Sequence, residues 1–152
     1  MKKINLIKFL IILFFISGCG YNPIFSNKDN NFSIYELSLS GNNKLNKIIS
    51  GKLNNYKGSN NPKMFSIQLE TNLIKEVASK DTKGNPTTYR INLKTDVIVK
   101  DGEGNIKNKL FYKSIDYNNK DNKSSLKKFE NEISKNLAEK ISDEIIIYLR
   151  SI

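Results

Sequence analysis

The chain has 152 residues, of which 38% are hydrophobic, and its 25 lysines and arginines outnumber its 15 acidic residues to give a formal net charge of +10. It contains no histidine, no tryptophan and a single cysteine, which excludes Ser-His-Asp and Cys-His catalysis, the commonest zinc ligands and an internal disulfide. Chemistry by two carboxylates stays possible, but the acidic residues alternate with lysines and none are paired, so we expect neither an enzyme, nor a metal, nor a cofactor.

The first 18 residues have the pattern of a cleavable secretory signal. Three lysines among the first eight residues precede an apolar run over 9–16. That run reaches about 12 Å as a helix, far short of a bilayer core of about 30 Å. It ends in Ile-Ser-Gly-Cys, which resembles the bacterial lipobox, in which the cysteine receives a diacylglycerol. We predict that residues 1–18 are removed and that Cys19 is lipidated. The alternative is an ordinary signal peptide with a chance cysteine.

The positive charge is spread along the remaining chain, with no cluster denser than Lys127-Lys128. A basic protein suits an anionic partner, which could be a nucleic acid, a membrane surface or a phosphorylated glycolipid. Because an exported lipoprotein meets no nucleic acid, we favour the glycolipid or the membrane. The alternative is a general compositional bias towards lysine and asparagine.

Residues 19–32 are rich in polar residues and lack periodicity, so they are expected to form a lipidated flexible tether, followed by one domain over 33–152. Within 35–40, Tyr35, Leu37 and Leu39 alternate with polar residues, which predicts a half-buried strand. Apolar residues at helical spacing then predict a helix over about 45–56, capped by Asn42 or Asn43.

Three further strands are predicted to form an antiparallel meander. The first alternates over 65–73, with an expected bulge at Leu73-Ile74. The next runs over 89–100 and is the longest and cleanest. The hairpin Asp-Gly-Glu-Gly-Asn over 101–105, in which both glycines are expected to adopt positive φ, leads into a fourth strand over about 110–117.

A helix is predicted from Ser124 to the C-terminus. Its apolar seam advances by three or four residues, and its members are Leu126, Phe129, Ile133, Leu137, Ile141, Ile145, Tyr148 and Ile152. Ile146 and Ile147 broaden the seam, so the last two turns should pack more deeply or touch a partner. The order β-α-β-β-β-α predicts an α+β fold with two helices on one face of a four-stranded, mainly antiparallel sheet.

The sequence resembles a known family in two places. Cys-Gly-Tyr-Asn-Pro-Ile-Phe over 19–25 is similar to the opening of the lipopolysaccharide-assembly lipoprotein LptE, particularly its alphaproteobacterial branch. Ser-Ile-Asp-Tyr-Asn over 114–118, leading through a polar loop to a long amphipathic helix, also looks like that family. The order of strands and helices agrees along nearly the whole length after Cys19.

The resemblance implies an outer-membrane lipoprotein subunit of the lipopolysaccharide translocon. Such a subunit is lipid-anchored on the periplasmic side, plugs the large β-barrel LptD, assists its assembly and aids delivery of lipopolysaccharide to the cell surface. Gly20 after the cysteine, rather than aspartate, also favours the outer membrane. Another outer-membrane assembly or pilot lipoprotein and a carboxylate-dependent periplasmic enzyme are the alternatives.

A row of basic residues on the third strand is the candidate glycolipid site. Arg90, Lys94 and Lys100 are separated by even numbers of residues, so they should point to the same face of the sheet. Such a row suits a multiply phosphorylated head group. The alternative is that these side chains only keep a sheet face wet.

Overall fold

The computed structural model describes residues 31–58, 61 and 63–152, so Cys19 and the predicted signal and tether up to residue 30 lie outside the described residues. The elements follow the order β1 (Ser33–Gly41), α2 (Asn43–Leu53), a 3-10 turn η1 (Asn54–Tyr56), β2 (Met64–Lys80), β3 (Pro86–Asp101), β4 (Ile106–Asn118) and α3 (Lys123–Ser151). In the described part of the chain, neither helix combines the length and the apolar character needed to cross a membrane.

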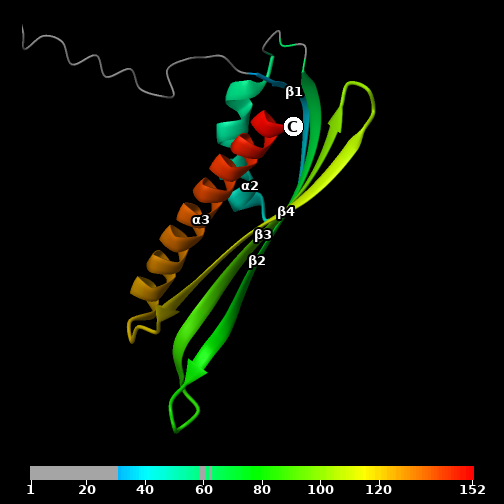
Figure 1. Ribbon diagram of the computed structural model, residues 1–152. Helices are drawn as coiled ribbons and strands as arrows, with labels where there is room; N and C mark the ends of the chain where they lie inside the picture. The colour runs from blue at the N-terminus through cyan, green and yellow to red at the C-terminus, as the bar shows by residue number, and fades with distance from the viewer. Residues whose placement is uncertain (1–30, 59–60, 62) are drawn as a thin grey trace, which may run out of the picture.

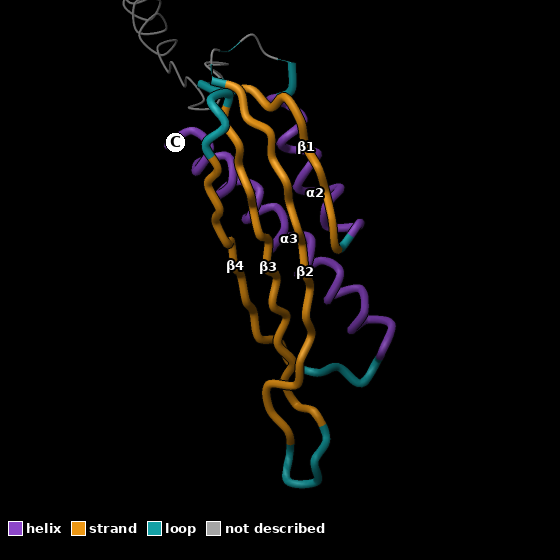
Figure 2. Tube along the Cα trace, turned by 90° about the vertical axis from the view of Figure 1, so that its right-hand side faces the viewer, coloured by secondary structure: helices purple, strands orange, loops and turns teal. Residues whose placement is uncertain are grey.

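The four strands form one sheet in the order β1-β2-β3-β4 (Figures 1 and 2). β2, β3 and β4 are joined by hairpins and pair antiparallel, as the sequence predicts. β1 pairs parallel with β2, because α2 carries the chain back to the starting end before β2 begins. Both helices lie on one face of the sheet and leave the other face uncovered (Figure 2). The α+β prediction is confirmed.

Both helices begin at an asparagine cap. The side chain of Asn42 accepts a hydrogen bond from the backbone N–H of Leu45 at 3.2 Å, and that of Asn122 accepts one from Ser125 at 3.0 Å. Each bond satisfies one of the amides that a helix leaves unpaired in its first turn. The predicted cap of the first helix is therefore confirmed at Asn42.

The core lies between the helices and the covered face of the sheet. On β3 the predicted inward residues from Ile91 to Val99 are all buried, including Thr95, whose hydroxyl lies 3.4 Å from that of Thr71. The α3 seam is confirmed at Leu126, Ile133, Leu137, Ile141 and Ile145, while Phe129, Tyr148 and Ile152 are partly buried. Ile146 is also partly buried, whereas Ile147 is 64% exposed, so the deeper packing holds for Ile146 and contact with a partner stays the expectation for Ile147.

The first strand follows the predicted alternation only in part, with Leu37 packed against the edge of the core. A register irregularity lies between Ile34 and Glu36, so the alternation changes at Tyr35. Ile34 is buried, whereas Tyr35 is 79% exposed and Leu39 is also exposed, because β1 is an edge strand that the helices cover only in part. Phe32, expected in the tether, is fully buried and stacks on Tyr56 with a centroid distance of 4.7 Å.

The predicted bulge at Leu73-Ile74 is wrong. β2 pairs with β3 without interruption there, and its irregularities lie instead between Val77 and Lys80, next to the hairpin. The apolar pair at 73–74 arises because Leu73 is turned to the core while Ile74 is exposed on the open face.

Both hairpins are closed by an aspartate followed four residues later by an asparagine. Asp101 accepts hydrogen bonds from the backbone N–H of Glu103 and Asn105 and from the Asn105 amide, and Asp81 does the same in its own turn. The hydrogen bond from the Asn105 side chain is the main reason that the pKa of Asp101 is lowered below its ordinary value. Only Gly104 of the second hairpin adopts positive φ, at 91°, so the expectation for Gly102 is wrong.

Candidate functional site on the open face of the sheet

The uncovered face of the sheet carries the alternate residues of each strand that point away from the helices. On β3 these include Arg90, Lys94 and Lys100, because the odd-numbered residues between them are buried under the helices. The structure therefore brings the three predicted basic residues onto one face. They are strung along the strand rather than gathered, since Lys94 and Lys100 stand about 20 Å apart at roughly 3.3 Å per residue.

Arg90 forms a two-pronged ion pair with Asp116 of β4. Its Nε and one terminal nitrogen donate to the two carboxylate oxygens at 2.6 and 2.8 Å. The hydrogen bond from Arg90 is the main reason that the pKa of Asp116 is lowered, and the same bond raises the pKa of Arg90. Because the guanidinium is already satisfied by a carboxylate, Arg90 offers less free charge to a phosphate than the sequence suggested.

Beside this pair, Asn92 holds three neighbours in place. Its side-chain oxygen accepts hydrogen bonds from the hydroxyls of Tyr112 and Ser114 at 2.7 and 2.8 Å, and its amide donates to Glu76 at 2.9 Å. Asn92 is only 7% exposed although no helix covers this face, because these partners close over it. The result is a fixed polar surface across β2, β3 and β4.

Lys94 and Lys100 are the open lysines of the predicted row. Both are exposed, and neither forms an ion pair with any of the described residues. Lys94 stands between Asn72 and Tyr112 on the neighbouring strands, and Lys100 stands between Ser66 and Ile106. The surface around Lys94, in the middle of the row, therefore has hydroxyl and amide groups beside an ammonium without an ion pair, which suits sugar and phosphate groups.

Sequence reasoning missed three residues of this surface, namely Asn92, Tyr112 and Asp116. The signal was present in the hairpin, because the Asp101–Asn105 loop fixes a register that sets Arg90 opposite Asp116 and Asn92 opposite Ser114. The irregular apolar pattern of β4 hid this register, since Leu110 and Tyr112 lie on the open face while Phe111 is buried.

A second polar cluster lies on the covered side, where Glu130 of α3 meets β2 and β4. Glu130 accepts hydrogen bonds from Lys75 at 2.5 Å and from the Tyr117 hydroxyl at 2.8 Å. Partial burial alone would raise the pKa of Glu130, but the two hydrogen bonds outweigh it and the pKa is lowered. Burial, followed by the bond to Glu130, raises the pKa of Tyr117. This cluster holds the start of α3 on the sheet.

No group of three or more acidic or cysteine side chains that could hold a metal ion occurs in the part of the chain that the structure describes. The chemistry available on the open face is hydrogen bonding and ion pairing to a bound partner.

Several solved lipoprotein structures have the same fold as this chain. The rare lipoprotein B of Shewanella oneidensis matches with a TM-score of 0.57 at 20% sequence identity, over 76% of this chain and 94% of that one. The chain has the rare lipoprotein B fold. The same fold relates it to a minor lipoprotein from Acinetobacter baumannii (TM-score 0.60, 12% identity, 80% of this chain and 92% of that one) and to lipoprotein B from Nitrosomonas europaea (0.54, 11%, 76% and 83%). No protein-family model matches the sequence, and no curated protein sequence matches it either.

Proposed function

We propose that the chain is an outer-membrane lipoprotein, anchored through Cys19, that acts as the LptE-type subunit of the lipopolysaccharide translocon. In this role it would plug the LptD β-barrel, assist its assembly and aid delivery of lipopolysaccharide to the cell surface. The observation that carries the proposal is the fold shared with the rare lipoprotein B of Shewanella oneidensis, in a chain whose residues 19–25 also resemble the LptE opening.

The surface of the domain is compatible with residence inside a wide barrel. The lumen of such a barrel is polar and water-filled, so a plug needs a wet outer surface rather than an apolar one. The middle of the open face is polar and is stiffened by the Arg90–Asp116 pair and the bonds around Asn92, although Ile74, Ile98 and Leu110 are exposed on the same face. A fixed polar surface can form hydrogen bonds to the barrel wall without first losing side-chain freedom.

The same face is the proposed contact for lipopolysaccharide. Lys94, beside Tyr112, supplies a charge without an ion-pair partner among the described residues, and Lys100 supplies a second one farther along β3. Arg90 stays in the proposed site as a group that must exchange part of its bond with Asp116 for a phosphate. In this scheme Lys94 makes the first contact and Arg90 follows.

A second candidate function is another outer-membrane assembly or pilot role, which shares the anchor, the fold and the absence of a catalytic mechanism. Depletion distinguishes the two candidates, because only a subunit of the translocon is needed for lipopolysaccharide to reach the cell surface. Depleting the chain in its host should leave newly made lipopolysaccharide inaccessible to surface labelling, while other outer-membrane lipoproteins still reach their membrane. Normal surface labelling after depletion would favour the second candidate.

A further inference from the structure

Large apolar side chains are exposed at the end of the sheet where β1 begins, β3 ends and β4 begins, here called the tether end. Tyr35 is 79% exposed and Ile106 is 68% exposed, the two highest values among the large hydrophobic residues of the described chain, and Met64 is 50% exposed. These residues lie at nearly the same level across the sheet. Met64 pairs with Ser33, two residues before Tyr35, and Ile106 pairs with Lys100 on the far side.

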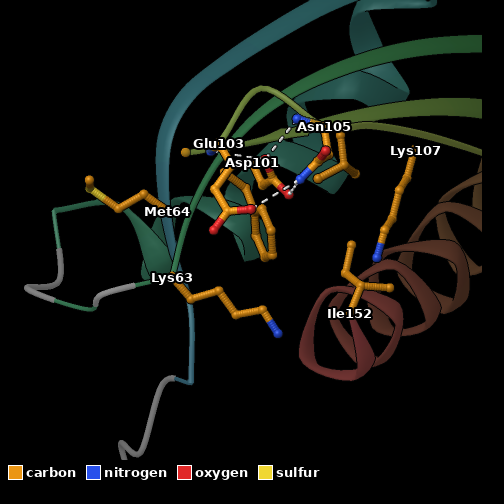
Figure 3. Close-up of a pocket in the computed structure, with 10 residues that line it drawn as sticks. Lys63, Met64, Asp101, Glu103, Asn105, Lys107 and Ile152 are labelled. Atoms are coloured by element: carbon orange, nitrogen blue, oxygen red, sulfur yellow. Dashed lines mark hydrogen bonds between the residues drawn. The ribbon is translucent and has the colours of Figure 1, made fainter.

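Two shallow pockets meet at Met64. One, of about 340 Å³, is lined by Tyr35, Met64 and Lys100 among others, and the other, of about 270 Å³, lies on the helix side. In the second pocket Lys63 and Lys107 approach Ile152 from two sides while Met64 points away from them (Figure 3). The tether end is thus an uneven apolar rim rather than a closed binding cavity.

Lysines flank Met64 and Ile106. Lys63 precedes Met64 in the chain, Lys107 follows Ile106, and Lys100 is paired with Ile106 across the strands. Within the described residues none of the three lysines forms an ion pair. Aromatic and aliphatic side chains with lysines beside them suit the boundary of a bilayer, where the apolar part enters the acyl region and the ammonium reaches the phosphates.

The carboxylates at the tether end equal the three lysines in number. They are Glu36, which accepts a hydrogen bond from Ser66, Asp101, which closes the hairpin, and Glu103, which accepts one from Asn105. Long-range attraction to anionic lipid is therefore weak, and contact with a membrane must depend mainly on insertion of the apolar side chains.

The proposed lipid anchor on Cys19 indicates that the partner of this surface is the membrane. Only residues 20–30 separate Cys19 from the described domain, which begins at this same end with the buried Phe32. At about 3.4 Å per residue such a segment spans at most roughly 40 Å. A lipid on Cys19 would hold the tether end close to the membrane surface, where a weak contact gains from a high effective concentration.

We propose that the tether end, through Tyr35, Met64 and Ile106, inserts into the interface of the lipid bilayer that holds the Cys19 anchor and so fixes the orientation of the domain on the membrane. This inference rests on the lipid anchor of the proposed function and not on the barrel. With the tether end at the bilayer, the β2–β3 hairpin at the opposite end of the sheet points away from the lipid (Figure 1).

The absence of tryptophan from the chain allows a direct test with single reporters. The lipidated full chain carrying Tyr35→Trp, Met64→Trp or Ile106→Trp is reconstituted into vesicles of phosphatidylethanolamine and phosphatidylglycerol with brominated acyl chains. We expect the fluorescence of all three reporters to be quenched at least about twofold more than that of a Val77→Trp control on the distant hairpin. Quenching should persist in high salt and in vesicles without phosphatidylglycerol, because insertion rather than charge holds the contact.

A second set of variants shows whether the apolar residues cause the contact. Tyr35→Glu combined with Ile106→Glu should abolish quenching of the Met64→Trp reporter, whereas Ile74→Glu combined with Val77→Glu should leave it unchanged. All four positions are exposed, so the melting temperature serves as a check that the variants fold. Equal quenching at Met64 and Val77 would overturn the proposal, as would burial of the Tyr35→Trp reporter only after assembly with a barrel protein. Failure of the chain to stay in the vesicles would instead contradict the lipid anchor.

Discussion

Arg90 and Asp116 stand directly opposite each other on β3 and β4 and are joined by two hydrogen bonds of 2.6 and 2.8 Å. The pair sits on the uncovered face of the sheet, half exposed to solvent. Because Asp116 neutralises Arg90, the charge that Arg90 can offer to a phosphate depends on this carboxylate. Substitutions at Asp116 and at Lys94 can therefore test the contributions of Arg90 and Lys94 separately.

Binding of lipopolysaccharide should depend on Lys94 and should be limited by Asp116. In low salt, Lys94→Glu is expected to weaken binding to the detergent-solubilised lipidated chain by about two- to fivefold, as for loss of one exposed ionic contact. Combining it with Arg90→Glu should weaken binding further, and Asp116→Asn should strengthen it because Arg90 is released.

The matched control for this measurement is Lys127→Glu, an exposed lysine on α3 away from the open face. If both substitutions weakened lipopolysaccharide binding equally, the effect of Lys94→Glu would come from the change in net charge and not from a specific contact. Binding isotherms unchanged by the Arg90 and Lys94 substitutions would remove the open face as the glycolipid site.

The α3 seam should control stability. Leu137 is 6% exposed among the core residues, so Leu137→Ala is expected to lower the free energy of unfolding by about 2 to 5 kcal/mol through lost burial and a residual cavity. Lys135→Ala, two residues away, removes a side chain that is 62% exposed and should change it little. Urea unfolding of the two variants compares them directly, and similar midpoints would mean that the seam is not buried.

The cluster around Glu130 should make stability depend on acid. Because the pKa of Glu130 is lowered in the folded chain, its ionised form stabilises the fold above the ordinary carboxylate range, and this contribution is lost as pH falls through the folded pKa. Glu130→Gln should therefore flatten the acid limb of a plot of unfolding free energy against pH. At neutral pH it should cost about 1 to 3 kcal/mol, as for loss of a hydrogen-bonded charge.

A variant of a neighbouring exposed acid gives the comparison for Glu130. Glu132 lies in the same turn of α3 but is exposed. Glu132→Gln should leave the acid limb as it is in the unmodified chain. An acid limb that is the same for all three proteins would show that the hydrogen bonds from Lys75 and Tyr117 do not stabilise the fold.

Much of the fold was predictable because its strands and helices are strongly patterned. β3 alternates from Tyr89 to Val99, α3 keeps its seam for about seven turns at 3.6 residues per turn, and Asn42 marks the start of α2, so local sequence and tertiary packing agree. β1 was harder, because the extra residue Tyr35 shifts the alternation at the start of the strand and leaves this tyrosine exposed. A single extra residue of this kind cannot be located from alternation alone.

The candidate site was predictable only in part. The shared face of Arg90, Lys94 and Lys100 follows from the period of two of a strand. The partner of Arg90 depends on pairing with β4, which is fixed by the Asp101–Asn105 loop rather than by the residues around Asp116. The sequence of β3 alone therefore does not show that Arg90 is paired with a carboxylate, because this depends on the register between β3 and β4.

Lipidation should depend on Cys19. Stable anchoring needs more than one acyl chain, since a single chain holds a protein only marginally at about 0.8 kcal/mol per buried CH₂. Cys19→Ser should therefore release the domain into the periplasm or leave the signal uncleaved, as fractionation and the mass of the purified chain would reveal. A processed Cys19→Ser protein that stays firmly bound to the membrane would contradict the lipid anchor.

The most direct test of the account is purification of the tagged chain from outer membranes in mild detergent. The account predicts that a large β-barrel protein with the size and heat-modifiable migration of LptD is retained in stoichiometric amount. It also predicts retention by the Lys94→Glu variant, whose effect is confined to the glycolipid, and loss with the unfolding Leu137→Ala variant above its melting temperature. Recovery of the intact chain without any barrel protein would contradict the proposal that it is a subunit of the translocon.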